Sequence, residues 1–192
     1  MMTTTDKRVL RTQRALTQAL EELAIHHDYQ DITVTNLTRA AGINRKTFYL
    51  HYNSIDDLVN QFADQITRQL AAIIHQHPIK TVYQHPGLLL DDFVDFAEAH
   101  SAAVKRLLFS DDYSRFANRI ERQLTQVLAD AIRDSYPLSR QDALIAAHFL
   151  IHNTLSLFSY FSTQATGGKI DRTVFKQYVE RLNMTGVSTF FN

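Results

Sequence analysis

The chain has 192 residues, of which 45% are hydrophobic and 21% are charged, as is typical of a globular protein. With only 5 Gly and 3 Pro, the sequence speaks against turn-rich sandwiches and barrels and favours long helices. The lack of Cys excludes disulfides, cysteine nucleophiles and thiolate metal sites, and it is consistent with a reducing cytoplasm. The first residues lack the apolar stretch of a signal peptide, so we do not expect secretion.

The 20 basic and 20 acidic side chains cancel, so the net charge gives no hint of a nucleic-acid partner. Their distribution is slightly uneven, because residues 1–53 carry a net charge of +2 and the remainder carries −2. Four of the cations in the first part lie within residues 7–14. The solvated face of an ordinary first helix would look the same, so charge alone does not indicate a DNA contact.

Helical patterns begin near the N-terminus. The first covers residues 6–26, and its apolar side chains share one face: Val9, Leu16, Leu20 and Leu23. A short helix is predicted after Thr33, whose hydroxyl can cap the free amides of the first turn, and Gly42 is expected to end it. Asn44 can cap a second short helix, which ends before residues 51–53.

A longer helix follows. Ser54 with Asp57 forms a capping-box pattern, and one apolar stripe then continues to about His75. Residues 78–87 contain two of the three Pro and are predicted to form a loop. The next helical patterns cover about 88–100, 102–109 and 112–135, and Ser139 with Asp142 makes another capping box.

Residues 143–168 contain no Asp, Glu, Lys or Arg, so this run must be tested as a membrane span. Its first 20 residues include seven polar side chains, which makes lipid exposure costly, and we expect no membrane contact. The run has two apolar stripes and therefore needs partners on two sides. Either it is the central helix of one subunit, or a second subunit covers one side; we favour the second subunit. A final helix is predicted at about residues 171–183.

The two short helices, joined by residues 41–44, follow the helix-turn-helix plan, in which the second helix presents its first residues to the major groove. Its core-facing side chains are Ile43, Phe48 and Tyr52. Arg or Lys can donate to guanine, Thr can contact thymine, and other polar side chains suit phosphates. The candidate DNA-binding residues are Thr33, Thr35, Asn44, Arg45, Lys46, Thr47, Tyr49 and His51. Helix pairs of this size also occur purely as packing units.

Residues 7–60 resemble the DNA-binding domain of the tetracycline-repressor (TetR/AcrR) family. The resemblance is carried by residues 33–52, TVTNLTRAAGINRKTFYLHY, and by Ser54, Asp56, Asp57 and Leu58. The family has there a Thr-led helix, Ala-Ala-Gly-aliphatic, a capping Ser or Asn, and aromatic-Tyr-x-His-aromatic before a capped fourth helix. One position departs, since Ile55 stands where the family usually has a Lys that reaches a phosphate.

The resemblance implies an all-α chain with a three-helix DNA-binding domain in residues 1–53. A long fourth helix joins it to a helical ligand-binding and dimerisation domain in residues 54–192. It also implies a cytoplasmic homodimer, formed through residues 139–165 and 171–183, that binds palindromic double-stranded operator DNA. Members of the family are mostly repressors released by a small apolar or amphipathic effector, which is the function expected here.

Candidate effector-binding residues are aromatic and histidine side chains of the second part: Phe93, Phe96, His100, Phe116, His148, Phe149 and His152. Aromatic side chains at helical spacing are more often plain core. His148 and His152, four residues apart, could share a metal ion, but no nearby carboxylate completes a ligand set in the sequence. We therefore expect them to line a pocket or an interface, and we expect no metal site.

Two other function classes remain as alternatives. For an enzyme, the sequence lacks glycine-rich phosphate loops and the Gly-x-Ser-x-Gly pattern. Its acidic pairs, at 91–92 and 111–112, fall near helix starts, where anions are favourable. We expect no enzyme and no cofactor. The second alternative is a helical protein-interaction module whose helix-turn-helix no longer binds DNA, which Ile55 and the zero net charge support.

Overall fold

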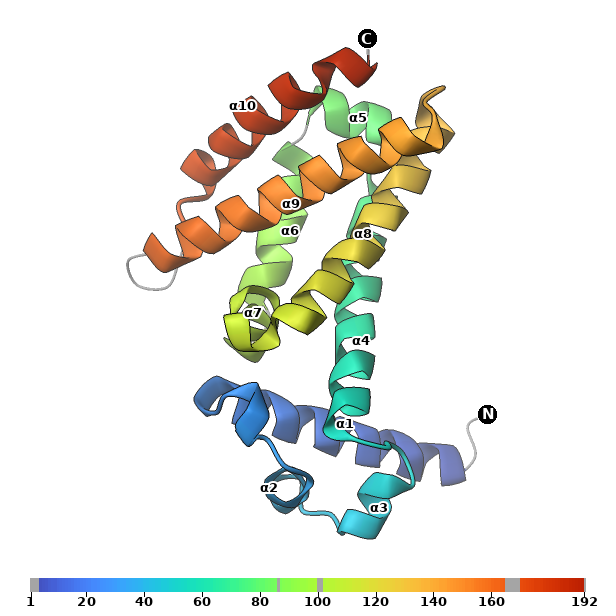
Figure 1. Cartoon of the computed structure of the whole chain (residues 1–192), viewed down its shortest axis with the longest axis vertical. Coiled ribbons are helices and arrows are strands. Elements are labelled where there is room, and N and C mark those ends of the chain that lie inside the picture. Colours follow the sequence, from blue (N-terminus) through green and yellow to red (C-terminus); the bar gives the residue numbers. More distant parts are fainter. Residues whose placement is uncertain (1–3, 86, 100–101, 165–169, 192) are drawn as a thin grey trace. The chain divides into compact units, whose positions relative to one another are not determined.

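The computed structural model of the chain describes residues 4–85, 87–99, 102–164 and 170–191 (Figure 1). Every regular element in these ranges is helical, as the scarcity of Gly and Pro predicts. The α-helices are α1 (Thr4–His26), α2 (Val34–Ala40), α3 (Arg45–Tyr49), α4 (Ile55–Gln76), α5 (Ile79–Gln84), α6 (Gly87–Ala99), α7 (Ala102–Phe109), α8 (Ser114–Ser135), α9 (Arg140–Gln164) and α10 (Arg172–Phe191). Two 3₁₀ turns are η1 (Tyr29–Asp31) and η2 (Asp111–Tyr113).

The chain forms two compact units. The first unit comprises Met1–Ile66 and His100–Ala117, and the second unit comprises Thr67–Ala99 and Asn118–Asn192. The helix α4 carries residues of both units. The domain boundary that we predict between residues 53 and 54 stays a prediction.

In the first unit, α1 packs against α2 and α7, and α2 packs against α3 (Figure 1). Its core is built from large apolar side chains that are almost completely buried: Leu16, Leu20, Leu37, Phe48, Leu58 and Phe116. The apolar face of residues 6–26 therefore covers the short helices, as its periodicity indicates.

Two arginines attach residues 102–117 to the rest of the first unit. Arg106 donates to Asp28 at 2.5 Å and to Asp112 at 3.2 Å. Arg115 pairs with Asp56 at 2.6 Å, and Tyr29 donates to the same carboxylate. The ends of α1 and the start of α4 are thus tied to α7 and α8 by ion pairs between residues far apart in the sequence.

In the second unit, α9 and α10 lie side by side, and α10 also packs against α6 (Figure 1). Phe158 and Phe175 are buried between these elements, with ring centroids 5.8 Å apart. Ion pairs reinforce the contact between α6 and α10, where Lys176 bonds Asp91 at 2.8 Å.

The structure differs from the predicted elements in two places. Residues 79–84, expected as loop, form α5, because buried Ile79 anchors a short helix that Pro78 can open. The last helix continues to Phe191 rather than ending near residue 183. Its C-terminal part is poor in strong helix formers, but Val187 is buried, so packing outweighs propensity there.

By length and composition, residues Arg140–Ser162 of α9 are apolar enough to cross a membrane. This is weak evidence for a span, because the core helix of a soluble protein passes the same test. Only 17% of the apolar window is buried within the structure, so α9 is not the fully buried central helix of one subunit.

Candidate functional site

Thr33 caps the start of α2, as the sequence predicts, and together with Asn36 it forms a full capping box. The backbone N–H of Asn36 donates to the Thr33 hydroxyl at 3.2 Å, and the N–H of Thr33 donates to Asn36 Oδ1 at 2.8 Å. Ile32 and Leu37 on either side of the cap are both buried, which fits a hydrophobic staple. These local bonds fix where α2 begins.

The turn between α2 and α3 depends on Gly42, which has a φ of +63° and is the expected end of α2. Asn44 then caps α3, since the N–H of Lys46 donates to Asn44 Oδ1 at 2.9 Å. Both predicted signals are confirmed. They set the direction of a helix of only five residues.

Helix α3 has an inner and an outer face. Phe48 is completely buried, and Tyr52, just beyond the helix, is 4% exposed. Burial, and next the negative charge of Asp57, raise the pKa of Tyr52, so its phenol stays neutral. The assignment of these two rings to the core is confirmed.

The candidate DNA-binding residues come from both short helices: Thr33 and Thr35 belong to the start of α2, and the other six lie in α3 or next to it. Thr33, Thr35, Asn44, Arg45, Lys46 and Tyr49 are exposed, whereas Thr47 and His51 are half-buried. Within the described part of the chain, neither Arg45 nor Lys46 has an ion-pair partner. The outer face of α3 thus presents Tyr49 and the two cations without ion-pair partners, Arg45 and Lys46.

The next helix begins beside this face. Asp57 N–H donates to the Ser54 hydroxyl at 3.1 Å, while the Asp57 carboxylate accepts from the N–H of Asn53 at 3.0 Å rather than from Ser54. The carboxylate therefore fixes the residue before the cap. Ile55, the departure from the family pattern, is half-buried at the first position of α4.

Leu50 was not identified from the sequence as a functional residue. Its side chain is 81% exposed at the end of α3, although leucine is usually buried. Its place between Tyr49 and His51 puts an apolar group beside the polar outer face. An exposed leucine cannot be distinguished from a core leucine by residue type alone.

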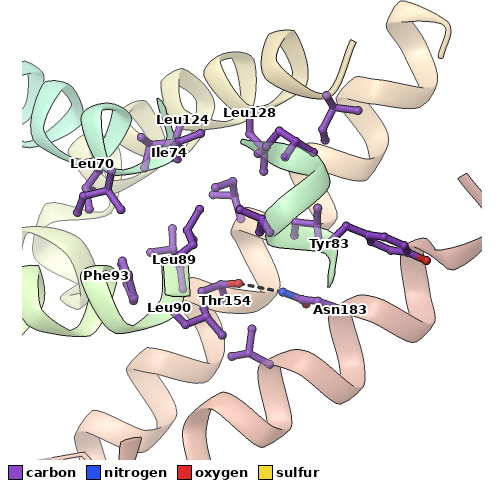
Figure 2. A pocket seen from close by; sticks show the side chains of 18 of the residues that line it. Leu70, Ile74, Tyr83, Leu89, Leu90, Phe93, Leu124, Leu128, Thr154 and Asn183 are labelled. Atoms are coloured by element: carbon purple, nitrogen blue, oxygen red, sulfur yellow. Dashed lines mark hydrogen bonds between the residues drawn. The ribbon is translucent and has the colours of Figure 1, made fainter. Parts of the chain in front are cut away.

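A separate feature is an apolar cavity of about 120 Å³ in the second unit (Figure 2). Side chains from α4, α5, α6, α8, α9 and α10 line it, and most of them are Leu, Ile or Val. The polar exception is a bonded pair in its wall, where Asn183 Nδ2 donates to Thr154 Oγ1 at 3.0 Å (Figure 2). Asn153 in turn donates to Asn183.

The predicted effector residues are distributed over several places. Phe93 lines the apolar cavity. Phe96 is buried but is not among the lining side chains, and His100 lies outside the described residues. Phe116 belongs to the first unit, where its ring packs edge-on against the ring of Tyr29 with the two centroids 5.1 Å apart. The aliphatic lining was missed because cavity-lining and core residues have the same composition.

The remaining three predicted effector residues gather in another hollow. His148, Phe149 and His152 line it together with Thr125 of α8. Glu121, also on α8, places Oε1 2.9 Å from His152 Nδ1, where it accepts a hydrogen bond when that nitrogen carries a proton and forms an ion pair when the whole ring is protonated. Among the described residues, no group of three or more His, Asp or Glu side chains is arranged so that it could hold a metal ion.

A known family model matches the segment that contains the helix-turn-helix. Residues 16–62 match the family model described as bacterial regulatory proteins, tetR family. The chain is 43% identical over 70 residues to the uncharacterized HTH-type transcriptional regulator YxbF of Bacillus subtilis strain 168. That match covers 36% of this chain and only 18% of the length of YxbF.

Solved structures match nearly the whole chain. A TetR transcriptional regulator from Streptococcus agalactiae 2603V superposes with a TM-score of 0.66 at 21% identity, covering 93% of this chain and 97% of that one. The fatty acid degradation regulator FadR from Bacillus halodurans gives 0.62 at 16% identity, with 92% and 96% covered. At these identities the likeness concerns the fold.

Proposed function

The chain belongs to the TetR family of bacterial regulatory proteins, and we propose that it represses transcription as a DNA-binding homodimer. In this proposal a small apolar or amphipathic effector releases the dimer from a palindromic operator in the cytoplasm. The observation that carries it is the capped α2–α3 pair, whose outer face presents unpaired cations beside a buried aromatic core.

The outer face of α3 supports sequence-specific contacts. Lys46 or Arg45 would donate to guanine, and Thr47 would contact a thymine edge. The hydroxyl groups of Thr33, Thr35 and Tyr49 would bind phosphates and set the register, with Asn44 and His51 beside them.

Ile55 removes a cation that the family usually places at the start of α4. The cations of α1 can compensate, because Lys7, Arg8, Arg11 and Arg14 are all exposed. Phosphate contacts make affinity fall steeply with salt, and each lost contact reduces the slope by about one. Arg11→Ala should therefore lower both the affinity and the salt dependence.

An exposed apolar stripe on α9 and α10 supports the homodimer. Ile145, Phe149 and Tyr160 on α9 and Tyr178 and Leu182 on α10 are between 40 and 60% exposed. Residues 143–162 carry no charged side chain, so water is a poor partner for this face. A second copy of the chain would cover it through the same stripe, as a two-fold axis requires.

The apolar cavity supports an apolar or amphipathic effector. Its volume is of the order that holds a benzene-sized molecule, so a longer ligand must move the surrounding helices. Leu70 and Ile74 of α4 line it, and α4 also begins directly after the helix-turn-helix. Effector binding would thereby shift α4 and change the separation of two recognition helices. The structurally similar FadR is described as a regulator of fatty acid degradation, which makes straight-chain fatty acids a reasonable first series.

Three measurements on the purified chain test the proposal. Sedimentation should show a dimer that Phe149→Glu disrupts, whereas Gln126→Glu on α8 should not. Binding to a palindromic duplex should weaken strongly with added salt, which a protein-interaction module would not show.

Leu150→Trp, which fills the cavity, should raise the fatty-acid concentration that is needed to release the DNA. Leu157→Trp, on the same helix, should leave that concentration unchanged. A monomer without affinity for any duplex would refute the proposal.

A further inference from the structure

A buried amide interrupts the hydrocarbon wall of the apolar cavity. Asn183 of α10 is 4% exposed, although most of the side chains around it are Leu, Ile or Val. Thr154 of α9 stands beside it and accepts its N–H at 3.0 Å (Figure 2). Two apolar side chains of the same shape would be about as stable as this bonded pair. Stability alone therefore does not account for the polar groups in the wall.

The polar pair keeps donors that the chain does not use. Asn183 Oδ1 accepts from Asn153 Nδ2, and Asn183 Nδ2 gives one of its two protons to Thr154 Oγ1. Within the described part of the chain, these are the hydrogen bonds of the two cavity side chains. The second amide proton and the hydroxyl proton of Thr154 thus remain for a ligand. Two donors side by side suit one acceptor oxygen.

The lining of the cavity offers no positive charge to an anionic ligand. None of the described residues that line it is Lys, Arg, His, Asp or Glu. Its one titratable side chain is that of Tyr83 on α5, whose hydroxyl points away from the cavity in Figure 2. Glu180, one turn before Asn183 on α10, would add a negative charge. Other charged or titratable side chains on or next to these helices pair with one another outside the lining: His152 with Glu121, Asp91 with Lys176, and Asp92 with His77.

We propose that the cavity selects an uncharged ligand with an apolar body and one acceptor oxygen, as in an alcohol or an amide. Asn183 and Thr154 bind this oxygen. The inference rests on the proposed effector site and narrows its ligand class. A carboxylate in the cavity would lose its hydration without gaining a counter-charge, which favours the neutral form of the acid. A straight-chain acid therefore binds in its protonated form, and its affinity depends on pH whereas that of an alcohol does not.

The test is calorimetric titration of the full chain, without DNA, with four small compounds: 1-hexanol, hexanamide, hexanoate and benzene. At pH 7.5 we expect hexanol and hexanamide to bind, and hexanoate to bind at least about 100-fold more weakly, because so few of its molecules are neutral. Between pH 8 and pH 6 the affinity for hexanoate should rise by about tenfold for each unit that the pH is lowered, since the neutral fraction rises by that factor. The affinity for hexanol should stay constant.

Variants separate recognition of the oxygen from packing. Asn183→Leu removes the amide donors and should weaken binding of hexanol and hexanamide by about fivefold. Benzene, which has no acceptor oxygen and is of a size that such cavities hold, should bind at least as tightly as before. Thr154→Val should act in the same direction, and it keeps the test available if Asn183→Leu does not fold. Gln177→Leu, at an exposed amide of α10, is the matched control and should bind all four compounds as the parent does.

Two results would overturn the inference and leave the proposed effector site standing. One is binding of hexanoate as tight as that of hexanol at pH 7.5. The other is an equal loss of benzene and hexanol binding in Asn183→Leu and Thr154→Val, which would show that the polar pair only supports the packing. Absence of binding by all four compounds would overturn both the inference and the effector part of the proposed function.

Discussion

The helix-turn-helix and the apolar cavity are built in different ways. Thr33 and Asn44 cap α2 and α3 through hydrogen bonds that span at most three residues. The cavity collects side chains between residues 70 and 184 from six helices. The surface that we propose for DNA is thus determined by local bonds, whereas the cavity that we propose for an effector depends on the packing of the whole second unit.

The largest effect is expected from the core of the first unit. Phe48→Ala removes a fully buried ring and should lower the free energy of unfolding by about 3 to 5 kcal/mol. Urea unfolding followed by circular dichroism measures it. Leu50→Ala, two residues away but 81% exposed, is the matched control and should change stability by less than about 0.5 kcal/mol. Similar costs for both would show that the inner and outer faces of α3 are wrongly assigned.

Tyr113 gives the first unit a sensitivity to alkali. Burial raises its pKa to about 12, and its hydroxyl has no partner among the described residues. Between pH 10 and 12 the unfolded chain has already lost this proton and the folded chain has not, so stability falls as the pH rises. The loss should reach about 2 to 3 kcal/mol.

Urea unfolding across this pH range checks the loss. Tyr113→Phe should flatten the decline and cost little at neutral pH, because no hydrogen bond is removed. Tyr178→Phe, at a half-exposed tyrosine, should leave the decline in place. An unchanged alkaline profile in Tyr113→Phe would assign the titration to another group.

The outer face of α3 should separate specificity from affinity. Lys46→Ala or Thr47→Ala should change the preferred bases, with about 1 to 3 kcal/mol of lost discrimination at the contacted position. Tyr49→Phe should weaken binding to all duplexes alike, because a phosphate contact carries no sequence information. Anisotropy titrations against an operator and its single-base variants distinguish the two patterns. Altered preference with intact affinity in Tyr49→Phe would reverse these roles.

The smallest effect is expected at a cap. Thr33→Ala removes the acceptor of the Asn36 N–H and should cost about 1 kcal/mol. Thr35→Ala, at an exposed position inside α2, tests the same chemical change without a cap. Equal stability of the two variants in urea would mean that local bonds do not determine this helix.

These contrasts explain how far the sequence could predict the molecule. The caps, Gly42 and the buried Phe48 depend on neighbours within a few residues, so spacing alone located them. The ion pair of Arg106 with Asp28 joins residues 78 positions apart, and no single sequence reveals such a partner.

The second unit was harder to predict for the same reason. The side chain of Phe93 lines the cavity, but the aliphatic residues around it look like ordinary core in the sequence. The pair formed by His148 and His152 was visible, whereas Glu121 became their neighbour only through the packing of α8 on α9.

The most direct test of the central claim is selection of bound sequences from a random duplex pool by the purified chain at near-physiological salt. We predict recovery of one palindrome with half-sites about 34 to 36 Å apart, read by two copies of α3. Loss of that enrichment in the Phe149→Glu variant would show that selection of the palindrome requires the dimer. No enrichment by the parent chain, either alone or with straight-chain fatty acids present, would contradict a DNA-binding regulator and favour a protein-interaction module.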